Sequence, residues 1–138
     1  MTMLLLDTCA AIWLANGDVM SAASRSAIRS AARRGEVFVS PVSAWEIGML
    51  AVRGRSSVSF MQGPEVWFDS LLTLSGIRLL GLTPRSAIAA SFLPGQLHGD
   101  PADRLLIAAA REVGAALVTR ARKILAYAKQ GHVKAVRG

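Results

Sequence analysis

The sequence predicts an α/β protein, a single-domain three-layer α/β/α sandwich around a mostly parallel central sheet. Three observations predict this fold. The 138 residues give the length of one domain that can bury a proper core. Of these residues 52% are hydrophobic and 18% charged, a composition that favours folding over disorder. Short apolar stretches alternate with helical patterns, which is typical of right-handed crossovers that leave helices on both faces of a parallel sheet.

The first half of the chain predicts two strands and three helices. Residues 3–7 (MLLLD) indicate a buried strand because they are apolar without alternation, and the helical spacing of 8–17 ends at Asn-Gly. An Ala-rich helix over 21–35 begins with Ser and ends with Gly. The β-branched and aromatic stretch 36–40 favours a strand, and 41–54, which opens with Pro, favours a helix.

The middle of the chain continues the alternation. The polar stretch 55–59 indicates a loop, and Pro begins an amphipathic helix over 64–76. Residues 77–82 favour a third strand, and 83–93 a helix opened by Thr-Pro. The Pro- and Gly-containing stretch 94–99 is expected to be a loop.

The clearest helix lies near the end of the chain. Residues 100–114 have an Asp cap, Pro at the first helical position and Gly after the last turn. A fourth strand over 115–119, a helix over 120–131 and a short final strand over 132–136 follow. The whole chain, 1–138, is therefore expected to form one domain.

The charge balance favours a polyanion as partner. Sixteen basic and nine acidic residues give a net charge of +7, which suits nucleic acid first but also suits mere solubility. No apolar run reaches the ~18 residues that span a bilayer. The start of the chain lacks Lys and Arg and Asp7 interrupts its apolar stretch, so we expect a cytoplasmic protein rather than a secreted one. The lone Cys9 suits a reducing compartment, and its apolar neighbours predict a buried, inert thiol.

Four acids lie at or just after the starts of predicted helices, and each has an ordinary structural explanation. Asp7 and Asp100 are in N-cap positions, and Asp103 lies in a first turn, where an acid complements the helix dipole. Glu46 follows Ser43 by three residues, which is a capping-box spacing.

Taken together, the same four acids predict a metal site. Ligands of parallel sheets bind beyond the carboxyl ends of the strands, and these helix starts face that edge. Carboxylates ~5 Å apart repel by about 3 kcal/mol at an effective dielectric of ~20, and a divalent cation removes that cost. Few hard oxygen ligands completed by water describe Mg²⁺ or Mn²⁺, whereas one Cys and two separated His do not make a usual zinc site. Such an ion activates water toward a phosphodiester, and a basic rim holds the flanking phosphates.

Four stretches of the sequence, LLLDTCAAIWL, SPVSAWEIGML, LHGDPADRLLIAAA and LVTRARKIL, resemble in order and spacing the motifs of PIN-domain ribonucleases. They are most similar to the VapC-type toxins of bacterial toxin–antitoxin pairs, over nearly the whole chain. The resemblance implies a PIN-like sandwich and a Mg²⁺- or Mn²⁺-dependent endonuclease acting on single-stranded RNA or on structured RNA such as tRNA. It also implies a homodimer, and an antitoxin whose C-terminal segment lies across the site.

The resemblance also assigns roles to residues. Asp7, Glu46 and Asp103 match the first three acids of the family's site, with Asp100 as an auxiliary member or alternative ligand. Thr119 matches the Ser or Thr found near the last acid.

One departure from the family pattern is at residue 121. The family commonly reads Thr-Arg-Asp after the fourth strand, and here Ala121 replaces the Asp. Three accounts stay open: one metal held by the three aspartates with Glu46 orienting water; a weak nuclease or an inactive RNA-binding protein; or a deliberately disarmed variant of a toxic enzyme. A phosphate-accepting receiver domain is a further alternative, but it needs an acidic residue after the third strand, and GLTPR contains none.

Several basic residues near the predicted site are candidates for RNA binding. Arg104 either binds phosphate or pairs with a neighbouring carboxylate. Arg120, Arg122 and Lys123 form the run RARK, which is either a solvated face or an RNA contact. His98 is read as a solvated loop residue, with a phosphate or water contact as the alternative.

Overall fold

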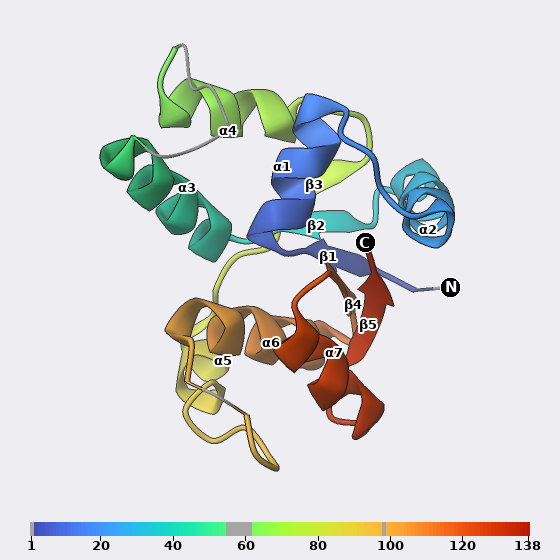
Figure 1. Cartoon of the computed structure of the whole chain (residues 1–138), viewed down its shortest axis with the longest axis vertical. Coiled ribbons are helices and arrows are strands. Elements are labelled where there is room, and N and C mark those ends of the chain that lie inside the picture. The colour runs from blue at the N-terminus through green and yellow to red at the C-terminus, as the bar shows by residue number, and fades with distance from the viewer. Residues whose placement is uncertain (1, 55–61, 98) are drawn as a thin grey trace.

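A computed structural model describes residues 2–54, 62–97 and 99–138, which form a five-stranded sheet of order β3-β2-β1-β4-β5 (Figure 1). The strands are β1 (Leu4–Leu6), β2 (Val37–Val39), β3 (Ile77–Leu79), β4 (Ala116–Thr119) and β5 (Lys134–Arg137). The helices are α1 (Thr8–Asn16), α2 (Ala22–Arg33), α3 (Pro41–Arg53), α4 (Pro64–Leu72), α5 (Pro84–Ala89), α6 (Pro101–Val113) and α7 (Arg122–Lys129). All four strand pairings are parallel.

Two hydrophobic clusters lie on opposite faces of the sheet, as the alternation of side chains along β1 requires. Leu4 and Leu6 pack in the cluster covered by α1, α2 and α4, and Leu5 packs in the one covered by α6 and α7 (Figure 1). Helix α3 reaches both clusters, through Val42 and Ile47. The predicted three-layer α/β/α sandwich with a parallel sheet is therefore confirmed.

Several local predictions were wrong, among them the end of the helix predicted over 64–76, because α4 ends at Leu72. Strand β3 covers only the first three residues of the predicted 77–82 strand, because it is an edge strand whose Leu79 is already half exposed. Helix α5 ends at Ala89 instead of 93, where the chain turns through bonds from Ser91 and Phe92 N–H to carbonyls three residues back. Cys9 is exposed, since it is not among the buried residues of α1, which are Thr8, Ala10, Ala11 and Ile12. The predicted loop at 55–59 and His98 lie outside the described residues.

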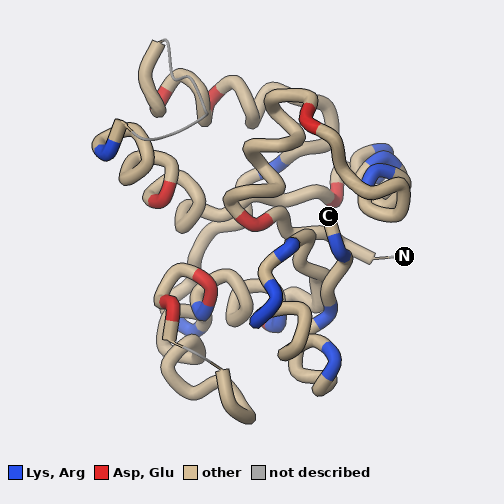
Figure 2. The backbone as a smooth tube through the Cα atoms, viewed as in Figure 1, with Lys and Arg blue, Asp and Glu red and all other residues tan. Residues whose placement is uncertain are grey.

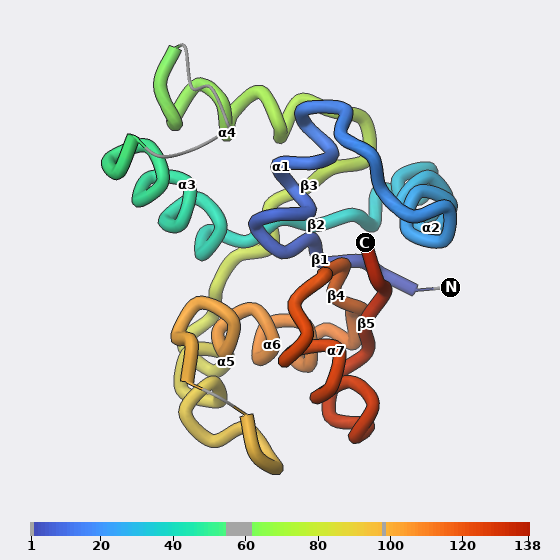
Figure 3. Tube along the Cα trace, in the orientation of Figure 1, coloured from blue at the N-terminus to red at the C-terminus, as the bar shows by residue number. Residues whose placement is uncertain are grey.

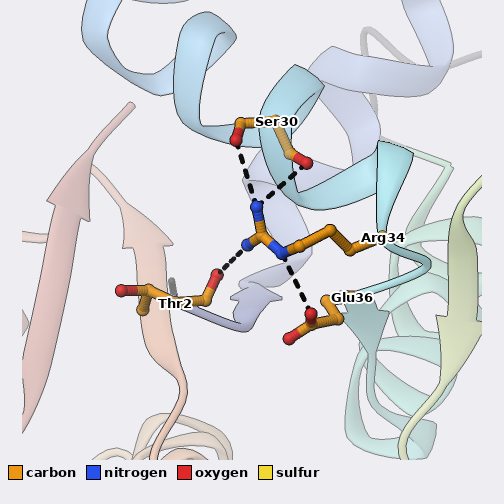
Figure 4. A network of polar contacts seen from close by, with 4 residues as sticks. All are labelled: Thr2, Ser30, Arg34 and Glu36. Carbon is orange, nitrogen blue, oxygen red and sulfur yellow. Dashed lines mark hydrogen bonds and ion pairs between the residues drawn. The ribbon is translucent and has the colours of Figure 1, made fainter.

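The amino edge of the sheet is closed by a network around Arg34 (Figure 4). Its guanidinium donates to Glu36 Oε1 at 2.9 Å, to the Thr2 carbonyl at 3.0 Å, and to both the carbonyl and the hydroxyl of Ser30 at 3.1 Å. Thr2 precedes β1 and Glu36 precedes β2, so one side chain ties α2 to the beginnings of two strands.

None of the helices within the described ranges is long and apolar enough to cross a membrane.

Candidate carboxylate site

Asp7 lies where β1 ends and α1 begins. Its Oδ1 accepts a hydrogen bond from Ala10 N–H at 2.8 Å, so the predicted N-cap is confirmed. The residue is 8% exposed. This burial raises the pKa of Asp7, opposed by a hydrogen bond from the Thr119 side chain and by the charge of Arg120. Thr119 is fully buried at the end of β4, the neighbour of β1, which explains the contact.

Glu46 is held by a hydroxyl that sequence patterns did not identify. Helix α3 is capped by Ser40, whose Oγ accepts from Val42 N–H at 3.0 Å, so Ser43 lies inside the helix and the capping-box prediction is wrong. Instead, Thr8 Oγ1 donates to the Glu46 carboxylate and lies 3.0 Å from Ser43 Oγ. Burial raises the pKa of Glu46, the Thr8 bond opposes that rise, and the nearby Asp100 and Asp7 charges add to it.

Asp100 and Asp103 begin α6. Asp100 Oδ1 accepts from Ala102 N–H at 3.0 Å and from Asp103 N–H at 3.3 Å, which confirms the predicted cap. Asp103 is half-buried in the first turn. Burial raises its pKa to about 6, the Asp100, Glu46 and Asp7 charges add to that rise, and Lys123 opposes it.

The four acids meet because α3 packs against both α1 and α6. Figure 2 shows acidic positions at the start of α1, on α3 and at the start of α6, and basic positions on α7, on β5 and on the more distant α2. Within the residues that the structure describes, the one ion pair joins Arg34 to Glu36, at the other edge of the sheet. The carboxylates Asp7, Glu46, Asp100 and Asp103, which we call the carboxylate site, thus lie near one another without a paired cation.

The donor set of the carboxylate site fits a hard divalent cation with a large water shell. One oxygen each of Asp7 and Asp100 already caps a helix, and Thr8 bonds Glu46. Among the described residues, no three His, Cys, Asp or Glu groups converge closely enough to ligate one ion. Mg²⁺ suits this arrangement, because it keeps several waters and needs only one or two carboxylates.

Two of the four basic residues predicted to bind RNA have side chains that bond backbone carbonyls, and the other two are exposed. Arg104 Nε donates to the Ala90 carbonyl at 2.8 Å and Nη1 to the Leu97 carbonyl at 3.2 Å, so Arg104 anchors the loop before α6. Arg122 and Lys123 are exposed in the first turn of α7, beside the site.

Arg120 is an anchor as well. Its guanidinium lies 3.7 Å from the Trp13 ring centroid and donates to the Gly138 carbonyl at 3.1 Å and the Val19 carbonyl at 2.7 Å. It therefore joins α1 to the end of β5, while its charge still acts on Asp7.

Ala121 occupies the N-cap of α7. It has no side chain to cap the helix, and its own N–H donates to Thr119 Oγ1 at 3.0 Å. Thr119 therefore contacts both Asp7 and the start of α7. An acidic side chain at position 121 would follow the carboxyl end of β4, at the same edge of the sheet as the four carboxylates.

This fold and the acids at its carboxyl edge define a class of protein, and comparison with known proteins identifies it. The sequence profile of the PIN domain matches residues 4–130, and the chain belongs to that family. Among curated proteins it is 36% identical over 126 residues to Ribonuclease VapC22 of Mycobacterium tuberculosis, covering 90% of this chain and 91% of that protein.

Solved structures share the same fold. The crystal structure of VapBC2 from Rickettsia felis bound to a DNA fragment from its promoter matches with a TM-score of 0.68 at 14% identity, covering 98% of each chain. The DNA-bound VapBC from Salmonella typhimurium matches with a TM-score of 0.65 at 15% identity, covering 99% of this chain and 98% of that one.

Proposed function

We propose that this protein is a metal-dependent endoribonuclease, the toxin of a type II toxin–antitoxin system, which cleaves phosphodiester bonds of tRNA-like or single-stranded RNA. One observation carries the proposal: Asp7, Glu46 and Asp103 lie together with raised pKa values, beside Asp100, in a chain of net charge +7. Cleavage of a phosphodiester with a divalent ion needs carboxylates to bind the ion and basic residues around them to bind the phosphates of the RNA. The identity to a ribonuclease supports the choice of RNA.

Each residue of the site has a role in this proposal. A bound Mg²⁺ or Mn²⁺ supplies the activation of water and the polarisation of the phosphodiester. Asp7, Asp100 and Asp103 would hold the ion, in part through water molecules of its shell, and Glu46 would orient the attacking water as a base whose position Thr8 fixes.

The cations around the site bind the RNA. Arg122 and Lys123 contact the phosphates on either side of the scissile bond. Arg104 and Arg120 keep one face toward the RNA while their hydrogen bonds position the surrounding chain.

The proposal includes a protein partner. The exposed fractions of Trp45 and Val52 on α3 are 54% and 89%, and those of Ile88 on α5 and of Phe92 after it are 65% and 79%. Large exposed apolar side chains favour protein interfaces, and we assign these to a cognate antitoxin and to a homodimer. The solved VapBC relatives support the antitoxin. We place the 138-residue single domain in the cytoplasm, with its RNA.

Cleavage of a labelled tRNA pool tests the enzyme. We expect cleavage with Mg²⁺ or Mn²⁺, none with excess EDTA, and a loss of more than about 100-fold in Asp7→Asn. Asp69→Asn is the matched control, since Asp69 is exposed on α4 and lies apart from the site. Cleavage that survives both EDTA and Asp7→Asn would refute the proposed site.

A second candidate is an RNA-binding protein that has lost turnover, and the uncapped Ala121 favours it. Ala121→Asp decides between the two. An RNA-binding protein gains cleavage only in the variant, whereas equal activity in both forms removes Ala121 as a defect. The variant also supplies an N-cap to α7, worth about 1 kcal/mol, so retained stability shows that it has folded.

A further inference from the structure

A pocket of about 530 Å³ lies between α7 and the loop that joins α5 to α6. Figure 3 shows the chain leaving α5, passing through this loop and returning to the start of α6. We call it the α7 pocket. Its polar and aromatic lining residues are Gln96, Arg104, Lys123, Tyr127 and Gln130.

The loop wall of the α7 pocket is fixed in place. Arg104 bonds the Ala90 and Leu97 carbonyls, at the two ends of the loop, and the hydroxyl of the buried Tyr127 donates to the Pro94 carbonyl. The loop also approaches His132 closely: a Cβ at Gly95 would lie 2.7 Å from His132 Nε2. The bonds of Arg104 and Tyr127 therefore hold the loop against α6 and α7.

The lining suits a nucleotide. Arg104 and Lys123 supply positive charge, and no acid is among the described residues that line the pocket. Gln96 and Gln130 each present an amide donor and acceptor, the complement of a base edge, and Leu93 and Leu97 add apolar surface. A volume of 300–1,000 Å³ is usual for small-ligand pockets, so about 530 Å³ accommodates one nucleotide.

The α7 pocket adjoins the carboxylate site. Arg104 follows Asp103 directly on α6, and the Lys123 charge acts on Asp103. Lys123 therefore both lines the pocket and acts on Asp103, so a phosphate bound at Lys123 would link the pocket to the carboxylate site.

We propose that the α7 pocket binds an unpaired nucleotide beside the scissile phosphodiester, and that Gln96 and Gln130 read its base. The inference rests on the proposed ribonuclease function and deepens it. A base inside a duplex cannot enter a pocket, so the substrate must be single-stranded at this position.

Sequencing the cleavage products of a random-sequence single-stranded RNA pool tests the pocket. In the double variant Gln96→Leu/Gln130→Leu we expect the preference for the favoured base at one position beside the cut to fall by about tenfold or more. Gln62→Leu is the matched control, because Gln62 is exposed just before α4. The base preference of this variant should equal that of the wild type. A double variant that folds, cuts and keeps the wild-type preference overturns the proposal.

A binding measurement keeps the pocket testable apart from cleavage. Titrating the metal-free wild-type protein with the four nucleoside 5′-monophosphates should shift the side-chain amide NMR signals of Gln96 and Gln130 and leave that of Gln62 in place. If no RNA is cut, this titration decides alone: shifts keep the pocket while the ribonuclease proposal is lost, and the absence of shifts overturns the pocket. If RNA is cut, the sequencing result decides.

Discussion

The two edges of the sheet treat charge in opposite ways. At the amino edge, Arg34 and Glu36 form a 2.9 Å ion pair, and the guanidinium also donates to Ser30 and Thr2 (Figure 4). At the carboxyl edge, Asp7, Glu46, Asp100 and Asp103 lie together, and the bonds they accept come from backbone N–H groups and hydroxyls.

This difference separates a structural network from the proposed functional site. The amino edge is complete as it stands, and its ion pair serves to join α2 to the sheet. At the carboxyl edge, burial raises the pKa values of Asp7, Glu46 and Asp103, and the charges of neighbouring acids add to the rise for Glu46 and Asp103. Perturbed carboxyl groups gathered at a ligand-binding edge are typical of sites that act on something outside the chain.

The largest expected effect separates activity from stability at the carboxyl edge. Asp103→Asn removes a charge that the other acids repel, so we expect RNA cleavage to fall by more than about 100-fold while the metal-free protein is no less stable. Cleavage assays and urea unfolding at pH 7.5 check both parts. A variant that loses stability and activity together would make Asp103 a structural residue like Arg34.

A smaller effect is expected from Thr8, which positions an acid of the carboxylate site but is not itself one of the four carboxylates. Thr8→Val keeps the shape of the side chain and removes the hydroxyl that positions Glu46, so cleavage should fall by about tenfold, with a larger change in kcat than in KM. Thr73→Val is the control, because the Thr73 hydroxyl at the end of α4 donates to the backbone carbonyl of Ser70 in the same helix. Equal losses in the two variants would remove Thr8 from the site.

Much of the fold followed from the sequence because local signals agreed with one another. The caps at Asp7 and Asp100 and the left-handed Gly114 end of α6 were all readable from residue type. The unbroken apolar run at 4–6 predicted a strand buried on both faces, and β1 is the central strand of the sheet. The acids were found because parallel strands bring their carboxyl ends to one edge.

The rest depended on contacts between distant segments. Glu46 matched a capping box, but Ser40 caps the helix and the carboxylate turns to Thr8, 38 residues away. Arg104 was predicted to bind phosphate or to pair with a neighbouring carboxylate, and the sequence did not indicate that it also donates to the Ala90 and Leu97 carbonyls. No local pattern indicates such partners, since they exist only once the chain has closed on itself.

At the amino edge the expectation is reversed. Arg34→Ala breaks the ion pair and the bonds to Thr2 and Ser30, which should lower the free energy of unfolding by about 1 kcal/mol, because the network is partly exposed. RNA cleavage at a temperature where both proteins are folded should equal wild type. Arg34→Lys keeps the charge but not the planar fork and should lose part of this stability. A loss of cleavage in folded Arg34→Ala would erase the contrast between the edges.

The smallest expected effect is a pH dependence that belongs to the carboxyl edge. The ordinary pKa of Asp103 is 3.8 and the folded value about 6, so between these values the folded protein keeps a proton that the unfolded chain has lost. Stability from this group is therefore present at low pH, falls as the pH rises from about 4 to 6, and is constant above that. Between pH 4.5 and 7.5 without metal, the melting temperature of wild type should drop by roughly 2 °C relative to Asp103→Asn, since solvent screens a half-buried carboxyl group. Mg²⁺ at pH 7.5 should remove that difference in wild type and leave Asp103→Asn nearly unchanged. Parallel melting curves for the two proteins would mean that burial and the neighbouring acids do not raise the pKa of Asp103.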